Sequence, residues 1–314
     1  MKRQKITVSS THLDSQGYIM TKEALESMLP FLNGERKIRV GLEHIRTFPP
    51  FGVTMNGEIV LGNDNHYYLI AENFYFDTQS ILTFEDGTQL LKESFSEGNF
   101  PFVECKPEII SKIHISTDPT NFRGHNEVNE IFKIATKDST LDFDTSLTGR
   151  KSEFPDPEMV ITITKTIAIA LGIIKTKIPE KIGEAIGEDL AKFYKLISSL
   201  AVQTVKRAIP ANRPKNFVIE FPNEDCIVEL VITTNIPDKV LQSLTKEKLA
   251  SIDQKIGQLV NLKPEKIQFV FNKQGNWEFN YLLSKDGSVI GQIKSFNKRN
   301  KLYNEILKAQ ESKD

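Results

Sequence analysis

The chain has 314 residues, which is more than one ordinary hydrophobic core requires, so two domains are expected. Its hydrophobic content of 39% and charged content of 26% are typical of a globular protein that dissolves in water. The formal net charge of -1 argues against a generally basic nucleic-acid binder, so no nucleic-acid partner is predicted. Cys105 and Cys226 lie far apart without a CxxC spacing, so neither a disulfide framework nor a structural zinc site is expected. This cysteine usage predicts a cytoplasmic protein.

Residues 159–174, MVITITKTIAIALGII, form the most apolar stretch and raise the question of a membrane span. The stretch is shorter than the roughly 20 apolar residues that a spanning helix needs. It also carries Lys165, whose charge is costly inside a bilayer. The pattern therefore predicts a buried strand or the start of a helix, and no membrane span. The opening residues MKRQKITVSST lack the apolar run of a signal peptide.

The first half of the chain reads as β-rich with short helices. Apolar residues recur at helical spacing over residues 21–32, where Thr21 is expected to be the N-cap. Residues 57–76 predict a hairpin around the turn GNDN. Residues 86–98 predict a further helix. Strands are predicted at 5–11, 37–44, 108–117, 129–136 and 139–147.

Residues 149–157, GRKSEFPDP, are polar and contain two prolines, which predicts a domain boundary. The predicted domains are a β-rich domain at 1–152 and a smaller α+β domain at 158–295, followed by a charged tail at 296–314. The second domain is expected to begin with a long amphipathic helix over 180–208. Two strands, a helix and an antiparallel meander of three strands are predicted after it, at 216–221, 226–234, 238–261 and 266–293.

Several familiar catalytic signatures are absent from the sequence. It contains no GxxxxGK[ST] loop, no GxGxxG after a strand, no HExxH and no GxSxG. No cofactor and no metal are therefore predicted. The remaining chemistry centres on a histidine and a serine. His44 precedes the stiff turn RTFPPFG, and Ser116 lies in HISTDPTNF, where His114 and Ser116 share one face of an extended strand.

A serine becomes nucleophilic when a base accepts its proton and a third group orients that base. His44 could supply the base for Ser116, and His114 or a carboxylate could supply the third group. The alternative for each residue is structural: His44 would bond to a nearby carbonyl, and Ser116 would cap a turn. The residues alone leave both readings open.

The first 150 residues resemble the phage prohead proteases, which mature capsids and are akin to the herpesvirus assemblins. The resemblance rests on ITVSSTHLDSQGYIM, on GLEHIRTFPPFG and on the strand-borne serine of KIHISTDPTNF. It implies a β-barrel-like core and a serine endopeptidase using Ser116 and His44. It also implies a third member, for which Asp142 is the best match; its rivals are Glu130, Asp144 and His114. The chain departs from the family after the serine, where Thr117, Asp118 and Pro119 follow.

The second half weakly resembles the small α/β modules appended to bacterial immune effectors, through the 180–208 helix and the two strands after it. This resemblance implies an interaction or assembly module in a bacterial or phage-related protein. The long helix is too apolar to face water along its whole length, which predicts packing on the first domain or a homo-oligomer through residues 180–208. Two functions are thus expected: a serine endopeptidase acting on a polypeptide, or a non-catalytic anti-phage defence or assembly protein that binds a protein partner.

Overall fold

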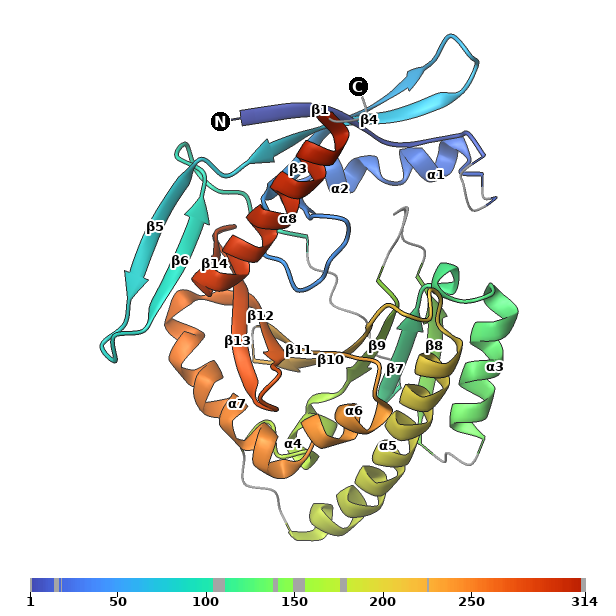
Figure 1. The fold of residues 1–314 in the computed structure, drawn as a ribbon, viewed down its shortest axis with the longest axis vertical. Helices are drawn as coiled ribbons and strands as arrows, with labels where there is room; N and C mark the ends of the chain where they lie inside the picture. The colour runs from blue at the N-terminus through green and yellow to red at the C-terminus, as the bar shows by residue number, and fades with distance from the viewer. Residues whose placement is uncertain are drawn as a thin grey trace. The chain divides into compact units, whose positions relative to one another are not determined.

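The fold was examined in a computed structural model (Figure 1). The structure describes residues 2–13, 17, 19–103, 111–137, 141–148, 156–175, 180–224 and 226–311, and the backbone alone for 180–188 and 310. Contacts between residues divide the chain into two compact units. Unit 1 comprises residues 1–105 and 281–314, and unit 2 comprises residues 106–280.

The bounds of these two units differ from those of the predicted domains 1–152 and 158–295, which stay a prediction. Most of the predicted boundary segment at 149–157, namely residues 149–155, lies outside the described residues. The chain passes between the units near residue 105 and again within strand β13 (Trp277–Ser284).

Unit 1 combines short helices with antiparallel strands. Its strands are β1 (Lys2–Ser10), β2 (Ile38–Val40), β3 (Gly52–Leu61), β4 (Tyr67–Tyr75), β5 (Thr78–Thr83), β6 (Gln89–Ser94), the end of β13, and β14 (Val289–Gly291). Its helices are α1 (Lys22–Glu26), α2 (Leu29–Asn33) and α8 (Ile293–Glu311) among the described residues. Four of the strands form a sheet in the order β1-β4-β3-β2. The outer strands β1 and β2 do not pair with each other, so the predicted barrel is not closed.

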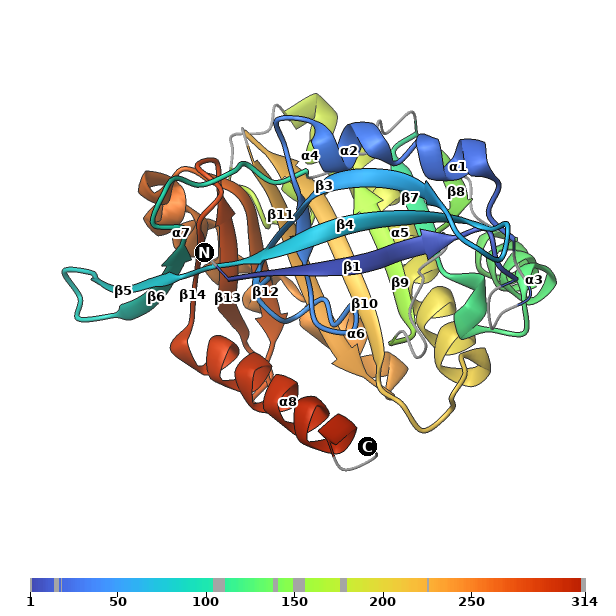
Figure 2. The ribbon, with the colours of Figure 1, turned by 90° about the horizontal axis from the view of Figure 1, so that it is seen from above.

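Helices α1 and α2 lie along one face of the four-stranded sheet (Figure 2). Thr21 caps α1 as predicted, because its Oγ1 accepts a hydrogen bond from the backbone N of Ala24 at 3.2 Å. The predicted helix over 21–32 is divided in two between Glu26 and Leu29. The apolar face of both helices buries a small core with β4, formed by Leu25, Leu32, Leu69 and Ala71.

The prediction of a helix at 86–98 is wrong. Residues Gln89–Ser94 form strand β6, which pairs antiparallel with β5 on one side and β14 on the other. The segment has ordinary helix-forming residues, but strands β5 and β14 pair with it through backbone hydrogen bonds on both sides. Tertiary pairing overrides local propensity in such cases.

The C-terminal helix α8 is part of the core of unit 1. Arg299 is only 2% exposed, and its guanidinium donates two hydrogen bonds of 2.9 Å to the Glu93 carboxylate. The same group donates to the carbonyl oxygens of Pro49, at 3.2 Å, and Pro50, at 2.7 Å. It also lies 4.0 Å from the ring centroid of Phe51. The charged residues of 296–314 predicted a tail, but one of them, Arg299, is buried and anchors α8 to the rest of unit 1.

Unit 2 is a sheet covered by helices. Its strands are β7 (Ile113–Thr117), β8 (Phe143–Leu147), β9 (Glu158–Ile163), β10 (Lys215–Asn223), β11 (Cys226–Thr234), β12 (Pro264–Phe271) and the start of β13. Its α-helices are α3 (His125–Thr136), α4 (Lys165–Ala170), α5 (Glu180–Arg207), α6 (Pro237–Ser243) and α7 (Lys246–Leu259) among the described residues. Within the unit the strand order is β13-β12-β11-β10-β9-β7-β8. Figure 1 shows α4, α5 and α6 on one side of this sheet.

The helix-covered face of the unit 2 sheet is apolar from β7 to β12. One row of residues in register runs from β7 to β12, and every member is fully buried: Ile115, Ile161, Ile219, Leu230 and Phe269. Burial of aliphatic and aromatic side chains of this size contributes roughly 1.5–3 kcal/mol each. This row fixes the register of the strands, because a slip by one residue would turn each apolar side chain to the opposite face.

The stretch at 159–174 forms most of strand β9 and then α4, which begins at Lys165 as a helix start. This agrees with the prediction of a buried strand or a helix start. Among the described residues, no helix has both the length and the apolar character needed to cross a membrane.

The long helix predicted at 180–208 is present as α5 (Glu180–Arg207). Phe193 and Ile197 of its apolar stripe are buried, and contacts come from α3, α4, α6 and β10 of the same unit. The side chains of Ile182 and Ile186 lie outside the described residues. Burial of the described stripe therefore needs no second copy of the chain, and the predicted homo-oligomer remains a prediction.

The helix predicted at 238–261 is present as two helices, α6 and α7, and the meander at 266–293 is present as β12, β13 and β14. The prediction of a strand at 129–136 is wrong, because these residues belong to α3. The buried residues of α3 recur at helical spacing, at Val128, Ile131, Phe132 and Ala135. The β-branched residues of IFKIAT suggested a strand, but the spacing of the buried side chains is that of a helix.

Candidate functional site

The three residues of the predicted catalytic site lie in different surroundings. His44 is exposed in a loop of unit 1, where Glu43 and His44 have φ values of 49° and 55°. Ser116 lies on β7 of unit 2 and is 8% exposed. Asp142 is exposed just before β8, and its carbonyl oxygen accepts a hydrogen bond from the backbone N of Ile113 at 3.2 Å. Because His44 and Ser116 belong to different units, their proximity stays a prediction.

The residues that the sequence offered in place of Asp142 as the third catalytic residue also fall into two groups. Glu130 lies on the exposed face of α3, where its carboxylate is 3.9 Å from the Lys133 ammonium. His114 and Asp144, in contrast, lie on the adjacent strands β7 and β8. The structure thus brings together two of the residues that the sequence offered as alternatives to each other.

Strands β7 and β8 run parallel, and their register places four polar side chains on one face. His114 is the cross-strand partner of Asp144, and Ser116 is the partner of Ser146. Side chains two residues apart on a strand share a face, so Asp144 and Ser146 lie on the face that carries His114. The alternation of side chains along β8 and the pairing of β8 with β7 together build the site.

The imidazole of His114 connects Asp144 and Ser146. Its Nδ1 is 2.9 Å from Oδ2 of Asp144, and its Nε2 is 2.9 Å from Oγ of Ser146. A neutral imidazole that donates its Nδ1–H to the carboxylate has an unprotonated Nε2, which accepts the hydroxyl proton. The order hydroxyl, imidazole, carboxylate is the arrangement of a serine nucleophile with its base and the group that orients the base.

Asp144 is held in place from its other side. Ser111 Oγ donates a hydrogen bond of 2.6 Å to Oδ1 of Asp144. Partial burial acts to raise the pKa of Asp144, but the hydrogen bonds from Ser111 and His114 outweigh it, and the pKa is lowered overall. Asp144 is therefore ionised at neutral pH and presents a negative charge to the imidazole. The side chains of His114 and Asp144 are 19% and 40% exposed, so solvent reaches the site.

Ser146 is the member that sequence reasoning missed. The segment STLDFDTSL offers aspartates as candidate third members, and strand alternation places Asp144 and Ser146 on one face. The missing information was the pairing of this strand with the one that carries His114. That pairing is parallel and spans the intervening helix α3. Parallel pairs need a crossover connection of this kind, and no local turn signals their register.

Polar residues continue from His114 across the same face of the sheet. Thr162, Glu220, Glu229 and Gln268 follow it in register on β9, β10, β11 and β12. The fully buried Glu229 accepts a hydrogen bond from Gln268 and lies 3.0 Å from the Lys266 ammonium. Buried charges are tolerated when they are paired and hydrogen-bonded in this way. This row is a second polar network beside the three-residue site.

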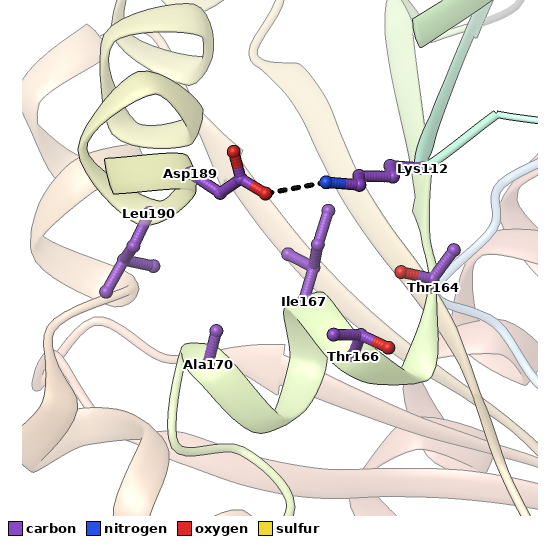
Figure 3. A pocket seen from close by; sticks show the side chains of 7 residues that line it. All are labelled: Lys112, Thr164, Thr166, Ile167, Ala170, Asp189 and Leu190. Atoms are coloured by element: carbon purple, nitrogen blue, oxygen red, sulfur yellow. Dashed lines mark hydrogen bonds and ion pairs between the residues drawn. The ribbon is translucent and has the colours of Figure 1, made fainter. Parts of the chain in front are cut away.

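A small pocket of about 170 Å³ opens elsewhere in unit 2 (Figure 3). It is lined by Lys112, Thr164, Thr166, Ile167, Ala170, Asp189 and Leu190. Lys112 and Asp189 form an ion pair of 2.7 Å, which joins α5 to the residue before β7. Because the two charges neutralise each other, the pocket presents mainly apolar groups and threonine hydroxyls.

No group of three or more His, Cys, Asp or Glu side chains is placed to hold a metal ion in the part of the chain that the structure describes. Comparisons of the chain with protein-family models, with curated proteins and with solved structures found no match. The geometry of His114, Asp144 and Ser146 therefore carries the functional argument.

Proposed function

We propose that the protein is a serine hydrolase whose nucleophile is Ser146, with His114 as general base and Asp144 as the group that orients it. The observation that carries this proposal is the pair of 2.9 Å contacts that the two ring nitrogens of His114 make with Ser146 and Asp144. An endopeptidase is the class of hydrolase that the resemblance to prohead proteases favours. The proposal keeps the predicted reaction and moves it from Ser116 to Ser146.

The reaction follows from the hydrogen bonds. Ser146 Oγ attacks the carbonyl carbon of an amide or ester while its proton passes to Nε2 of His114. The ionised Asp144 stabilises the imidazolium that forms. His114 then gives the proton to the leaving nitrogen or oxygen, which leaves an acyl group on Ser146. A water molecule, activated by the same imidazole, hydrolyses the acyl-enzyme and restores the hydroxyl.

The test is covalent labelling of the full-length chain with a fluorophosphonate probe, followed by peptide mapping of the adduct. We expect the label on Ser146 and its loss in the Ser146→Ala and His114→Ala variants. Ser80→Ala changes an exposed serine on β5 and serves as the matched control, which should keep full labelling. Circular dichroism of each variant verifies the fold.

Two outcomes would overturn the proposal. Labelling of Ser116 that depends on His44 would return the site to the one predicted from sequence. Absence of any specific label, on a protein that circular dichroism shows to be folded, would favour the non-catalytic scaffold.

A further inference from the structure

Strand β8, which carries Ser146, is the last strand of its sheet. In the described residues it pairs with β7 on one side only. Two backbone hydrogen bonds at the ends of β8 are directed to β7. The carbonyl oxygen of Asp142 accepts one from the backbone N of Ile113 at 3.2 Å, and the backbone N of Thr148 donates one to the carbonyl oxygen of Thr117 at 3.0 Å. Backbone groups point to alternate sides along a strand, so Phe143, Thr145 and Leu147 direct theirs away from β7. These residues form a row of donors and acceptors suited to a further strand.

We propose that the substrate is an extended polypeptide that adds to the β8 edge as an antiparallel strand and is cleaved beside Ser146. This inference rests on the proposed function, because it requires Ser146 to be the nucleophile. Addition of a peptide to a sheet edge is a common mode of recognition, in which backbone hydrogen bonds supply affinity and alternate side chains supply specificity.

The register of such a complex identifies the cleaved bond. Ser146 directs its backbone toward β7, so it would occupy a non-hydrogen-bonded position opposite the peptide, where facing Cα atoms are about 4.5 Å apart. The N–H of Leu147 would donate to the carbonyl oxygen of the peptide residue opposite it. In an antiparallel pair, that carbonyl is bonded to the nitrogen of the residue opposite Ser146. The bond between these two peptide residues is therefore the one within reach of the hydroxyl.

The same N–H of Leu147 has a chemical role. When Ser146 Oγ attacks, negative charge develops on the carbonyl oxygen that accepts this hydrogen bond. A backbone N–H aimed at that oxygen stabilises the charge, and loss of one such donor typically costs about 10²–10³ in rate. The residue after the nucleophile supplies this donor in other serine hydrolases. The outer edge of β8, which pairs with no further strand in the part of the chain that the structure describes, thus combines substrate binding with stabilisation of the oxyanion.

The side chain of Leu147 sets the expected preference. It is 36% exposed on the face opposite His114, and side chains directly opposite each other in a strand pair share a face. The peptide residue before the cleaved bond would lie against Leu147, which favours an apolar residue there. The residue after the bond would lie on the His114 face.

The first experiment uses internally quenched decapeptides that differ in the residue before the central bond: leucine, valine, lysine or glutamate. We expect cleavage after leucine and valine at least tenfold faster than after lysine or glutamate. The variant Leu147→Lys should reverse the order in favour of glutamate. Leu61→Lys changes an exposed leucine at the end of β3, and this control should keep the original preference.

The second experiment places N-methyl groups along the best decapeptide. The amide of the second residue after the cleaved bond would donate to the carbonyl of Thr145, so methylation there should slow cleavage at least tenfold. The amide of the third residue would point away from β8, so methylation there should change the rate by less than threefold. Equal effects at the two positions, or an unchanged preference in Leu147→Lys, would overturn the inference.

Hydrolysis of p-nitrophenyl butyrate separates this inference from the proposed function. The ester is too small to form a strand, so it requires only Ser146 and its base. If Ser146-dependent hydrolysis of the ester is present but no decapeptide is cleaved, strand addition is wrong and the proposed function stands. If Ser146-dependent ester hydrolysis and labelling are both absent, the proposed function itself fails.

Discussion

Replacement of Asp144 by asparagine tests the candidate site most directly, because it removes a charge and changes little else. The amide has nearly the shape of the carboxylate, and the Ser111 hydroxyl can accept a hydrogen bond from it as readily as it donates one now. The amide oxygen can then keep its contact with Nδ1 of His114. The main loss is the attraction between the carboxylate and the imidazolium that forms during the reaction.

The size of this loss follows from distance and exposure. Opposite charges 4 Å apart attract by about 4 kcal/mol at the dielectric typical of a protein surface, and by about 1 kcal/mol in bulk water. The contact of 2.9 Å between Nδ1 and Oδ2 and the 40% exposure of Asp144 place the site between these limits. A loss of about 2–4 kcal/mol in transition-state stabilisation corresponds to a decrease of about 30- to 1,000-fold in kcat/KM.

The assay is hydrolysis of p-nitrophenyl butyrate at neutral pH, with circular dichroism to verify the fold. Asp142→Asn is the comparison, because Asp142 was the third member predicted from sequence and lies two residues before Asp144. We expect a large loss for Asp144→Asn and less than a threefold loss for Asp142→Asn. A folded Asp144→Asn variant with nearly full activity would refute the orienting role of Asp144, and a large loss in Asp142→Asn alone would assign that role to Asp142.

Three further predictions concern pH and stability. Because the pKa of Asp144 is lowered, its carboxylate remains charged until the pH falls well into the acid range, so Asp144→Asn should lower kcat/KM by the same factor at neutral and at mildly acid pH; a factor that shrinks as the pH is lowered through this range would contradict this. Arg299→Met leaves the buried Glu93 carboxylate without its partner, so it should lower the free energy of unfolding of unit 1 by about 3–5 kcal/mol. Hydrogen exchange in α8, followed in urea, measures this change. A loss below about 1 kcal/mol would show that unit 1 does not need the ion pair. Phe193→Ala removes a fully buried ring from α5 and should destabilise unit 2 by about 3–5 kcal/mol. The fluorescence of Trp277, the single tryptophan, follows unfolding. An unchanged midpoint of the unfolding transition would contradict the packing of α5.

Elements whose apolar pattern is long and regular were predictable from the sequence. The helix α5, the strands β10 and β11 and the meander from β12 to β14 all follow such patterns. The two segments whose secondary structure was predicted wrongly, a helix in place of β6 and a strand in place of α3, have short apolar patterns. Strand β6 depends on β5 and β14 for its ladder, and α3 contains β-branched residues that favour a strand when read without their spacing.

The candidate site was predictable in composition but not in assembly. The shared face of His114 and Ser116 follows from strand alternation. Asp144 entered as an alternative third member only through the resemblance to the prohead proteases. The nucleophile was not predictable in this way. Ser116 lies on the same strand as His114, whereas Ser146 reaches the imidazole from the neighbouring strand, next to the Asp144 that orients it. Only the pairing of β7 with β8 decides which serine the ring contacts.

The loop GLEHIRTFPPFG first suggested a catalytic histidine, because a stiff turn can hold a base in position. The structure supplies another cause for the stiffness. The carbonyls of Pro49 and Pro50 accept hydrogen bonds from the buried Arg299, and the ring of Phe51 stacks on the same guanidinium. A loop that anchors the C-terminal helix must be rigid whether or not His44 takes part in chemistry. Rigidity is therefore weak evidence for catalysis, and the contacts of an imidazole with a hydroxyl and a carboxylate are stronger evidence, which His114 provides.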